Sequence, residues 1–152
     1  MKLSVIPIVL ALMSWGWGAD FSLAIGNPVA VTLPEGVVKK DIGFAVRTEN
    51  CADASKAQIT GTAEGIVNGA RRSVTLRVVP ASTAGAFAIS RDWPPQGAWV
   101  VNLTGHCGSS IASAIVPIGP NGFLRESAKF FPRAATAAEV ESALKTLTGG
   151  AQ

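Results

Sequence analysis

The chain has 152 residues, of which 48% are hydrophobic and 15% are charged, and its formal net charge is +3 at pH 7. This length is typical of one domain with a single core, and so low a charged fraction argues against a disordered chain. The densest basic groups are the pairs Lys39-Lys40 and Arg71-Arg72. Nucleic-acid binding needs a concentrated basic face with stacking aromatic residues, so we expect no nucleic-acid partner.

The N-terminal residues have the pattern of a secretory signal peptide. Lys2 precedes an uncharged apolar run over residues 3–13, and glycines occupy positions −3 and −1 of a cut after Gly18. The run is shorter than the roughly 20 apolar residues that a membrane-spanning helix needs. We predict a signal peptide over 1–18, cleaved after Gly18 or Ala19, and an exported protein, periplasmic or secreted, without a membrane span. An uncleaved membrane anchor is the alternative.

Residues 19–133 show apolar and polar side chains in alternation, which is typical of strands with one buried face. Asn68-Gly69 favours a type I′ turn, so the segments on either side of it should pair as a hairpin. Pro80 should end the second of them, since proline has no backbone donor. Seven to eight short strands separated by turns imply an antiparallel β-sandwich. The predicted strands cover residues 21–25, 29–33, 42–48, 58–67, 72–79, 86–90, 98–104 and 111–116, with a last segment over 123–131.

A helix is predicted at the C-terminal end, within a helix and tail over 134–152. Thr136 and Glu139 form a capping box, in which each side chain satisfies the other residue's backbone amide. Behind them apolar residues recur with helical spacing up to Gly149-Gly150, namely Val140, Ala143, Leu144 and Leu147. A helix this short is marginal alone, so we expect its apolar stripe to dock on the sandwich. A partner-binding helix is the alternative.

Two neighbouring segments resemble a known family. Gly85-Ala86-Phe87-Ala88 and Pro95-Gln96-Gly97-Ala98-Trp99-Val100-Val101 are similar to the paired-strand signature of small exported bacterial immunoglobulin-like domains. In that signature the tryptophan packs in the sandwich core. The resemblance covers residues 85–101, and it implies an immunoglobulin-like fold and an exported location. Some relatives bind copper through histidines and methionines, and those ligands are missing here, so that activity is not carried over.

Cys51 and Cys107 are predicted to form a disulfide, because an exported chain with an even number of cysteines lies in a disulfide-permissive compartment. Cys51 follows the predicted strand 42–48, and Cys107 lies between the predicted strands 98–104 and 111–116. In an immunoglobulin-type strand order these two loops emerge at the same pole of the sandwich. The bond would therefore link two loops, with a stabilisation of at most about 4 kcal/mol. Free thiols are the alternative.

The segment Gly105–Ser110 suggests a cysteine nucleophile only superficially. It faintly resembles the cysteine motif of papain-like proteases, but the further cysteine and the downstream aromatic residue of that motif are absent. His106 is the single histidine, and neighbouring side chains on a strand point apart, so it is poorly placed to activate Cys107. A Ser–His–Asp triad built on His106 would need distant partners, and no Gly-x-Ser-x-Gly elbow is present. We expect a polar loop beside a disulfide.

Metal and cofactor chemistry lack ligands. Zinc needs more ligands than one histidine supplies once both thiols form a disulfide. Glu49 and Asp53 flank Cys51, but calcium takes roughly six to eight oxygen ligands. No phosphate-binding glycine loop is present, so we expect neither a metal nor a cofactor. Carboxylates paired in space for glycoside hydrolysis stay open as an alternative.

The best binding candidate is the turn Arg91-Asp92-Trp93-Pro94-Pro95. Its tryptophan could stack on a sugar ring or on a partner's side chain. We favour the alternative that Trp93 covers the open end of the core against its prolines, as large aromatic residues mostly do. Asn102-Leu103-Thr104 matches a glycosylation sequon, which matters only in a eukaryotic secretory pathway.

Together these observations favour an exported, non-catalytic interaction or structural module. Its partner would be an unidentified protein or glycan in the envelope or outside the cell. The first alternative is a small-ligand or carbohydrate-binding β-sandwich that uses Trp93 and nearby polar groups. The second is a hydrolase with spatially assembled carboxylates or His106.

Overall fold

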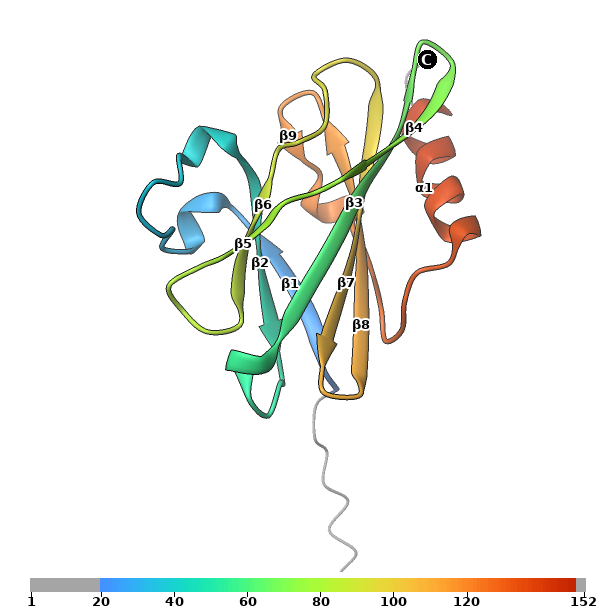
Figure 1. Ribbon diagram of the computed structural model, residues 1–152. Helices are drawn as coiled ribbons and strands as arrows, with labels where there is room; N and C mark the ends of the chain where they lie inside the picture. The colour runs from blue at the N-terminus through green and yellow to red at the C-terminus, as the bar shows by residue number, and fades with distance from the viewer. Residues whose placement is uncertain (1–19, 150–152) are drawn as a thin grey trace, which may run out of the picture.

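A computed structural model describes residues 20–149, which form two antiparallel sheets and one C-terminal helix (Figure 1). The predicted signal peptide and the last residues of the predicted tail lie outside the described residues. Within residues 20–149 no helix is long and apolar enough to span a membrane.

The two sheets contain ten strands, and every pairing between neighbours is antiparallel. The four-stranded sheet has the spatial order β1 (Ser22–Gly26), β2 (Ile42–Glu49), β6 (Ala86–Ser90) and β5 (Val78–Pro80). The six-stranded sheet has the order β10 (Lys129–Phe131), β8 (Ser110–Gly119), β7 (Ala98–Cys107), β3 (Gln58–Val67) and β4 (Ala70–Thr75), and β9 (Gly122–Phe123) pairs with β8. Short 3₁₀ helices occupy the connections, namely η1 (Pro28–Ala30), η2 (Lys39–Asp41), η3 (Ala54–Lys56) and η4 (Arg125–Ser127).

The local signals in the sequence predicted several elements correctly. β3 and β6 have the predicted bounds, and β3 and β4 form the predicted hairpin. Asn68 and Gly69 both have positive φ angles, 51° and 78°, as a type I′ turn requires. The hairpin is therefore determined by its own turn residues, because the twist of a type I′ turn matches that of the two paired strands.

The predicted number of seven to eight strands is too low, because residues 20–149 form ten, and two individual strand predictions are wrong. Residues 29–33 form η1 and an extended loop, and Thr32 bonds through its carbonyl oxygen to Ser82 N at 2.9 Å. Pro28 favours the first position of a helical turn, because its φ is fixed and it has no N–H. The predicted strand 72–79 is two strands in different sheets, β4 and β5.

The crossing between the two sheets lies at Leu76 and Arg77. Leu76 N still donates to Gly61 O of β3 at 3.0 Å, while Arg77 O accepts from Ser90 N of β6 at 3.0 Å. The alternation of apolar residues continues through this point, since Leu76 is buried in the core between both sheets. The apolar alternation over residues 72–79 therefore belongs to two strands, β4 in the six-stranded sheet and β5 in the four-stranded sheet.

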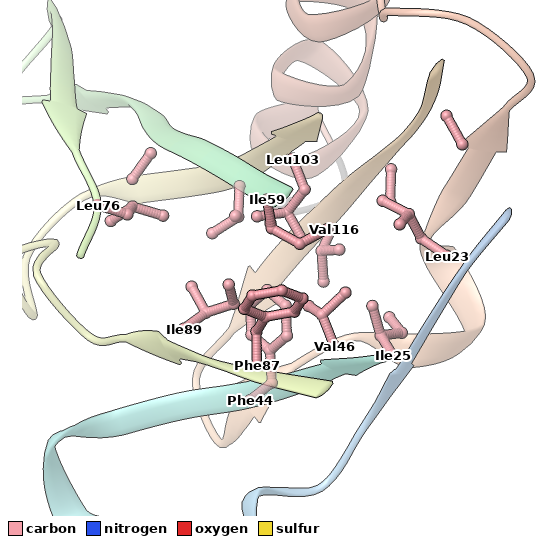
Figure 2. Close-up of a cluster of buried hydrophobic side chains, with 14 of the residues drawn as sticks. Leu23, Ile25, Phe44, Val46, Ile59, Leu76, Phe87, Ile89, Leu103 and Val116 are labelled. Atoms are coloured by element: carbon pink, nitrogen blue, oxygen red, sulfur yellow. The ribbon is translucent and has the colours of Figure 1, made fainter. Parts of the chain in front are cut away.

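The main core lies between the inner faces of the two sheets. Figure 2 shows Ile59, Leu103 and Val116 of the six-stranded sheet facing Phe44 and Phe87 of the other sheet. Phe44 and Leu103 have no exposed surface. Burying such side chains is worth roughly 1.5–3 kcal/mol each, so this interface is the main source of stability.

Helix α1 (Ala137–Gly149) packs on the outer face of the six-stranded sheet, as expected for a helix docked on its own chain. Val140, Ala143 and Leu144 are buried there against Val100 and Ile115. The capping box is confirmed: Glu139 N donates to Thr136 Oγ1 at 3.2 Å, and Thr136 N donates to Glu139 Oε1 at 2.9 Å. A second apolar cluster thus stands outside the main core.

Glu139 makes the start of α1 sensitive to acid. Arg133 donates to it at 2.7 Å, and this bond, with that from Thr136 N, lowers the pKa of Glu139 to about 2. A carboxylate with a depressed pKa stabilises the fold above its unfolded pKa, and this contribution is lost as the pH falls through the folded pKa. We expect Glu139→Gln to be less stable than wild type at neutral pH, and this difference to shrink as the pH falls from about 4.5 to about 2.

Urea unfolding midpoints across this pH range measure the effect. Glu35→Gln is the control, because Glu35 is exposed and forms no ion pair within the described residues. A stability difference for Glu139→Gln that stays constant into acid would show that its charge plays no part.

Candidate functional site

A cleft of about 650 Å³ opens at one pole of the sandwich. One wall is the connection between β6 and β7, and the other is the turn between β8 and β9, with Leu147 of α1 beside them. Figure 1 shows these two turns at the same end of the molecule. The lining side chains are mostly apolar and include Trp93, Pro94, Pro95, Trp99, Ile118, Pro120, Phe123 and Leu147.

Trp93 lies between this cleft and the core. It is only 9% exposed and belongs to the main core cluster. Its ring lies over the backbone of β2: a Cβ placed on Gly43 would be 2.5 Å from the Trp93 ring atom Cη2. Trp93 therefore covers the end of the core, as the favoured interpretation predicted, and presents little open ring face to a ligand.

Trp99 forms the floor beside it and is 2% exposed. Its indole Nε1 donates to Gln96 O at 2.8 Å, which satisfies the only polar atom of the side chain. Its ring lies against the backbone of Gly65 in β3. A Cβ atom on Gly65 would clash with the Trp99 ring atom Cε3, so any larger residue there would displace the ring. The core position that the family signature implied for this tryptophan agrees with the structure.

The structure separates the other two predicted binding residues. Asp92 is not among the residues that line the cleft. It pairs with Arg77: Nη2 lies 2.8 Å from Oδ1, and the Arg77 backbone N–H donates to Oδ2 at 2.8 Å. These Arg77 hydrogen bonds hold the pKa of Asp92 below its ordinary value. Asp92 therefore fixes the sheet crossing. Arg91 is exposed and lines the cleft, and its side chain forms no ion pair within residues 20–149.

The cleft combines a few polar side chains with many apolar ones. Arg91 and Asn121 supply the charged and amide groups among its lining residues. None of the described residues that line it is a serine, cysteine, histidine or acid, so these side chains offer neither a nucleophile nor a general acid. Sequence reasoning did not find the second wall, because no local signal places the turn at Asn121 and Gly122 opposite Trp93.

The opposite pole contains the Cys51–Cys107 disulfide, which confirms the predicted pairing of the two cysteines. The prediction that both lie in loops is wrong for Cys107, because β7 extends beyond the predicted end at Thr104 and includes it. Cys107 is the last residue of β7, and Cys51 follows β2, so the bond links the two sheets. The Cα atoms lie 5.8 Å apart, within the usual range for disulfides. A disulfide indicates a location outside the cytoplasm.

The acidic residues beside Cys51 serve local structure. Glu49 pairs with Arg47 at 3.0 Å, and Asp53 caps η3 by accepting from Ser55 N at 3.1 Å. In the part of the chain that the structure describes, no group of three or more histidine, cysteine or acidic side chains is arranged to hold a metal.

His106 and Asn102 both lie on the outer face of β7. His106 stands opposite Gln58 of β3 and Ile111 of β8, and its neighbour Cys107 is oxidised. Asn102, the residue of the sequon, is half-buried, and its Oδ1 is a buried atom without a hydrogen-bond partner among residues 20–149. Neither residue lines the pole cleft.

Comparison with protein-family models, curated proteins and solved structures gives no match for this chain. Function is therefore inferred from geometry alone. Among the described residues, the cleft combines the predicted residues Arg91 and Trp93 in one hollow surface.

The disulfide should contribute strongly to stability. Its two cysteines are 56 residues apart. Closing a loop of that length lowers the conformational entropy of the unfolded chain and so raises its free energy by about 4 kcal/mol. We expect reduction, or the double substitution Cys51→Ala with Cys107→Ala, to lower the free energy of unfolding by up to that amount. Urea unfolding with and without reductant measures it. The double variant is the control and should not respond to reductant; an equal response of both proteins would contradict the assignment.

Gly43 should be required for the position of Trp93. In Gly43→Ala the new methyl group meets the Trp93 ring, so the indole or β2 must move, at a cost of roughly 1–3 kcal/mol. We expect a lower unfolding midpoint and a shift of tryptophan fluorescence towards longer wavelength. Gly26→Ala is the matched strand control, since its nearest contact, Ala30 Cβ, would be an ordinary 3.9 Å away. Equal effects of the two substitutions would show that the ring does not rest on Gly43.

Proposed function

We propose that this chain is an exported, non-catalytic, immunoglobulin-like interaction module that binds an extended segment of a partner protein in its pole cleft. The cleft carries the proposal: it is a hollow of about 650 Å³ at an open pole, its accessible apolar surface comes mostly from prolines, Ile118, Phe123 and Leu147, and the exposed Arg91 lies at its edge. Aromatic residues and arginine are the side chains most enriched at the centres of protein interfaces.

The order of the strands supports an immunoglobulin-like fold. The neighbours β1-β2-β6-β5 correspond to strands A-B-E-D of that fold, and β8-β7-β3 correspond to G-F-C. β4 then occupies an additional place beside C. The disulfide joins the chain after strand B to the end of strand F. In antibody domains, by contrast, the conserved disulfide joins the middles of the same two strands. Strand β10 and helix α1 are additions to this pattern.

Export is supported by two separate features. The sequence of residues 1–18 has the pattern of a signal peptide. The disulfide is suited to an oxidising compartment such as the periplasm or the exterior of the cell.

A protein partner fits the cleft better than a carbohydrate. Stacking on a sugar needs an open aromatic face, and Trp93 is 9% exposed with its ring on Gly43. Peptide grooves lined by aromatic side chains hold extended, proline-rich segments through apolar contacts and few polar ones. Arg91 adds a cation that suits an acidic side chain or a carbonyl oxygen of such a segment. Carbohydrate binding is kept as the alternative function.

Selection of peptides tests the proposal. A displayed peptide library is panned on the chain from Ala19 onward, and we expect enriched peptides with apolar anchors beside an acidic residue. Arg91→Glu should weaken the selected peptides by about tenfold or more, because a charge-assisted hydrogen bond of about 1.5 kcal/mol or more becomes a repulsion. Arg72→Glu is the control, since Arg72 is an exposed arginine of β4 that does not line the cleft.

A glycan array with the same proteins tests the alternative. Arg91→Glu and Asn121→Trp are suitable cleft variants, because both residues are exposed, whereas Trp93→Ala would also remove core packing. A glycan bound by wild type and lost in these variants would favour carbohydrate. Peptides that bind both variants as tightly as wild type would remove the cleft as the binding site.

A further inference from the structure

A second hollow lies on the outer face of the four-stranded sheet and is separate from the pole cleft. It has a volume of about 520 Å³, which is within the range of small-ligand sites. Its floor is formed by β1, β2 and β6, and the segment 27–32 that follows β1 borders it. No residue is shared with the lining of the pole cleft.

Small side chains keep the floor of this hollow open. In the sheet register Arg47 stands between Ala24 of β1 and Ala86 of β6, and Ala45 stands opposite Gly26. Ala45 and Ala86 are 3% and 4% exposed, so they close the bottom of the hollow and offer almost no surface themselves. Ala24 is half-buried and Ala30 is exposed, so their methyl groups are the part of this alanine floor that an apolar body of a few carbon atoms can reach.

The bordering segment is held in place by backbone hydrogen bonds. Ala30 N donates to Asn27 O at 2.9 Å within η1, and Ser82 N donates to Thr32 O at 2.9 Å. Asn27, Thr32 and Thr83 all line the hollow and supply polar side chains at its rim. The hollow is therefore bounded by three parts of the chain that hydrogen bonds hold together: the strands of the sheet, the segment 27–32 and the loop at residues 82–83.

Two arginines give the hollow its charge. Arg47 rises from the floor, and Arg125 reaches it from η4 in the connection between β9 and β10. No acidic residue is among the described residues that line it. Arg125 forms no ion pair within residues 20–149, and the pair of Arg47 with Glu49 is solvent-exposed, with side chains 67% and 42% accessible. Exposed pairs of this kind contribute only about 0–1 kcal/mol, so a ligand can replace Glu49 at little cost.

We propose that this hollow binds a small organic carboxylate whose apolar body lies on Ala24 and Ala30. Arg47 and Arg125 bind the carboxylate, since guanidinium groups donate paired hydrogen bonds to such oxygens. The alanine floor favours an anion with a hydrocarbon part over a bare oxyanion such as phosphate. This site is independent of the function proposed for the pole cleft.

A titration of the isotope-labelled chain from Ala19 onward, followed by NMR amide shifts, tests the site with three probes. Hexanoate carries both the charge and the apolar body, hexanol carries only the body, and inorganic phosphate carries only the charge. We expect hexanoate to shift the amide signals of Ala24, Ala45 and Thr83. Hexanol and phosphate should bind at least about tenfold more weakly, because each lacks one of the two contributions.

Substitutions at exposed residues separate binding from folding. Arg125→Gln should weaken hexanoate by about tenfold, and the control Arg72→Gln should leave it unchanged. Glu49→Gln should strengthen hexanoate severalfold, because it frees Arg47 from its present partner. Ala30→Phe places a ring at the border of the hollow and should abolish binding while the unfolding midpoint is retained.

Three results would overturn the proposal. The first is that hexanoate shifts no amide signal of residues at the hollow. The second is that Arg125→Gln binds hexanoate as tightly as wild type. The third is phosphate that binds as tightly as hexanoate, which would show that the alanine floor contributes nothing.

Discussion

The burial of both faces of β7 organises the molecule. On the inner face Trp99, Val101 and Leu103 are at most 2% exposed and fill the core between the sheets. On the outer face Val100 has no exposed surface, because α1 covers it. A central strand buried on two sides cannot shift by one residue without exchanging these two sets of contacts. The register of β7 therefore fixes the positions of its ends, which are the cleft at Ala98 and the disulfide at Cys107.

The Arg77–Asp92 pair connects this framework to the cleft. Arg77 stands where the chain passes from one sheet to the other, and Asp92 is the residue before Trp93. The carboxylate accepts from the Arg77 side chain, the Arg77 backbone and Ser90 Oγ, so the start of the cleft wall is tied to the crossing. The three residues predicted to bind thus have different positions: Asp92 holds the turn, Trp93 covers the core, and Arg91 is exposed at the cleft.

Signals contained within a few residues correctly predicted several local elements of the fold. The Asn68-Gly69 turn, the Thr136–Glu139 capping box and the alternation in β3 each depend on neighbours in the sequence, and each is present. The division of 72–79 was missed because period-two alternation reports which side is buried and carries no information about which sheet the strand joins. Likewise, the apolar run at 29–33 contains strand-forming residues, but Pro28 starts a turn there.

The two hollows could not be predicted from the sequence, because each is assembled from distant segments. The cleft needs β2, the turns after β6 and β8, and the end of α1, while the second hollow needs three neighbouring strands and Arg125. The sequence drew attention to Trp93 because tryptophan is rare and bulky, yet bulk is what places it in the core. The groups that stay available to a ligand are arginines on turns and strand faces, which look like ordinary solvated charges in the sequence. Because Trp93 and Trp99 are buried by packing, we expect the specificity of any binding to come from those charges and from the shape of the small residues beside them.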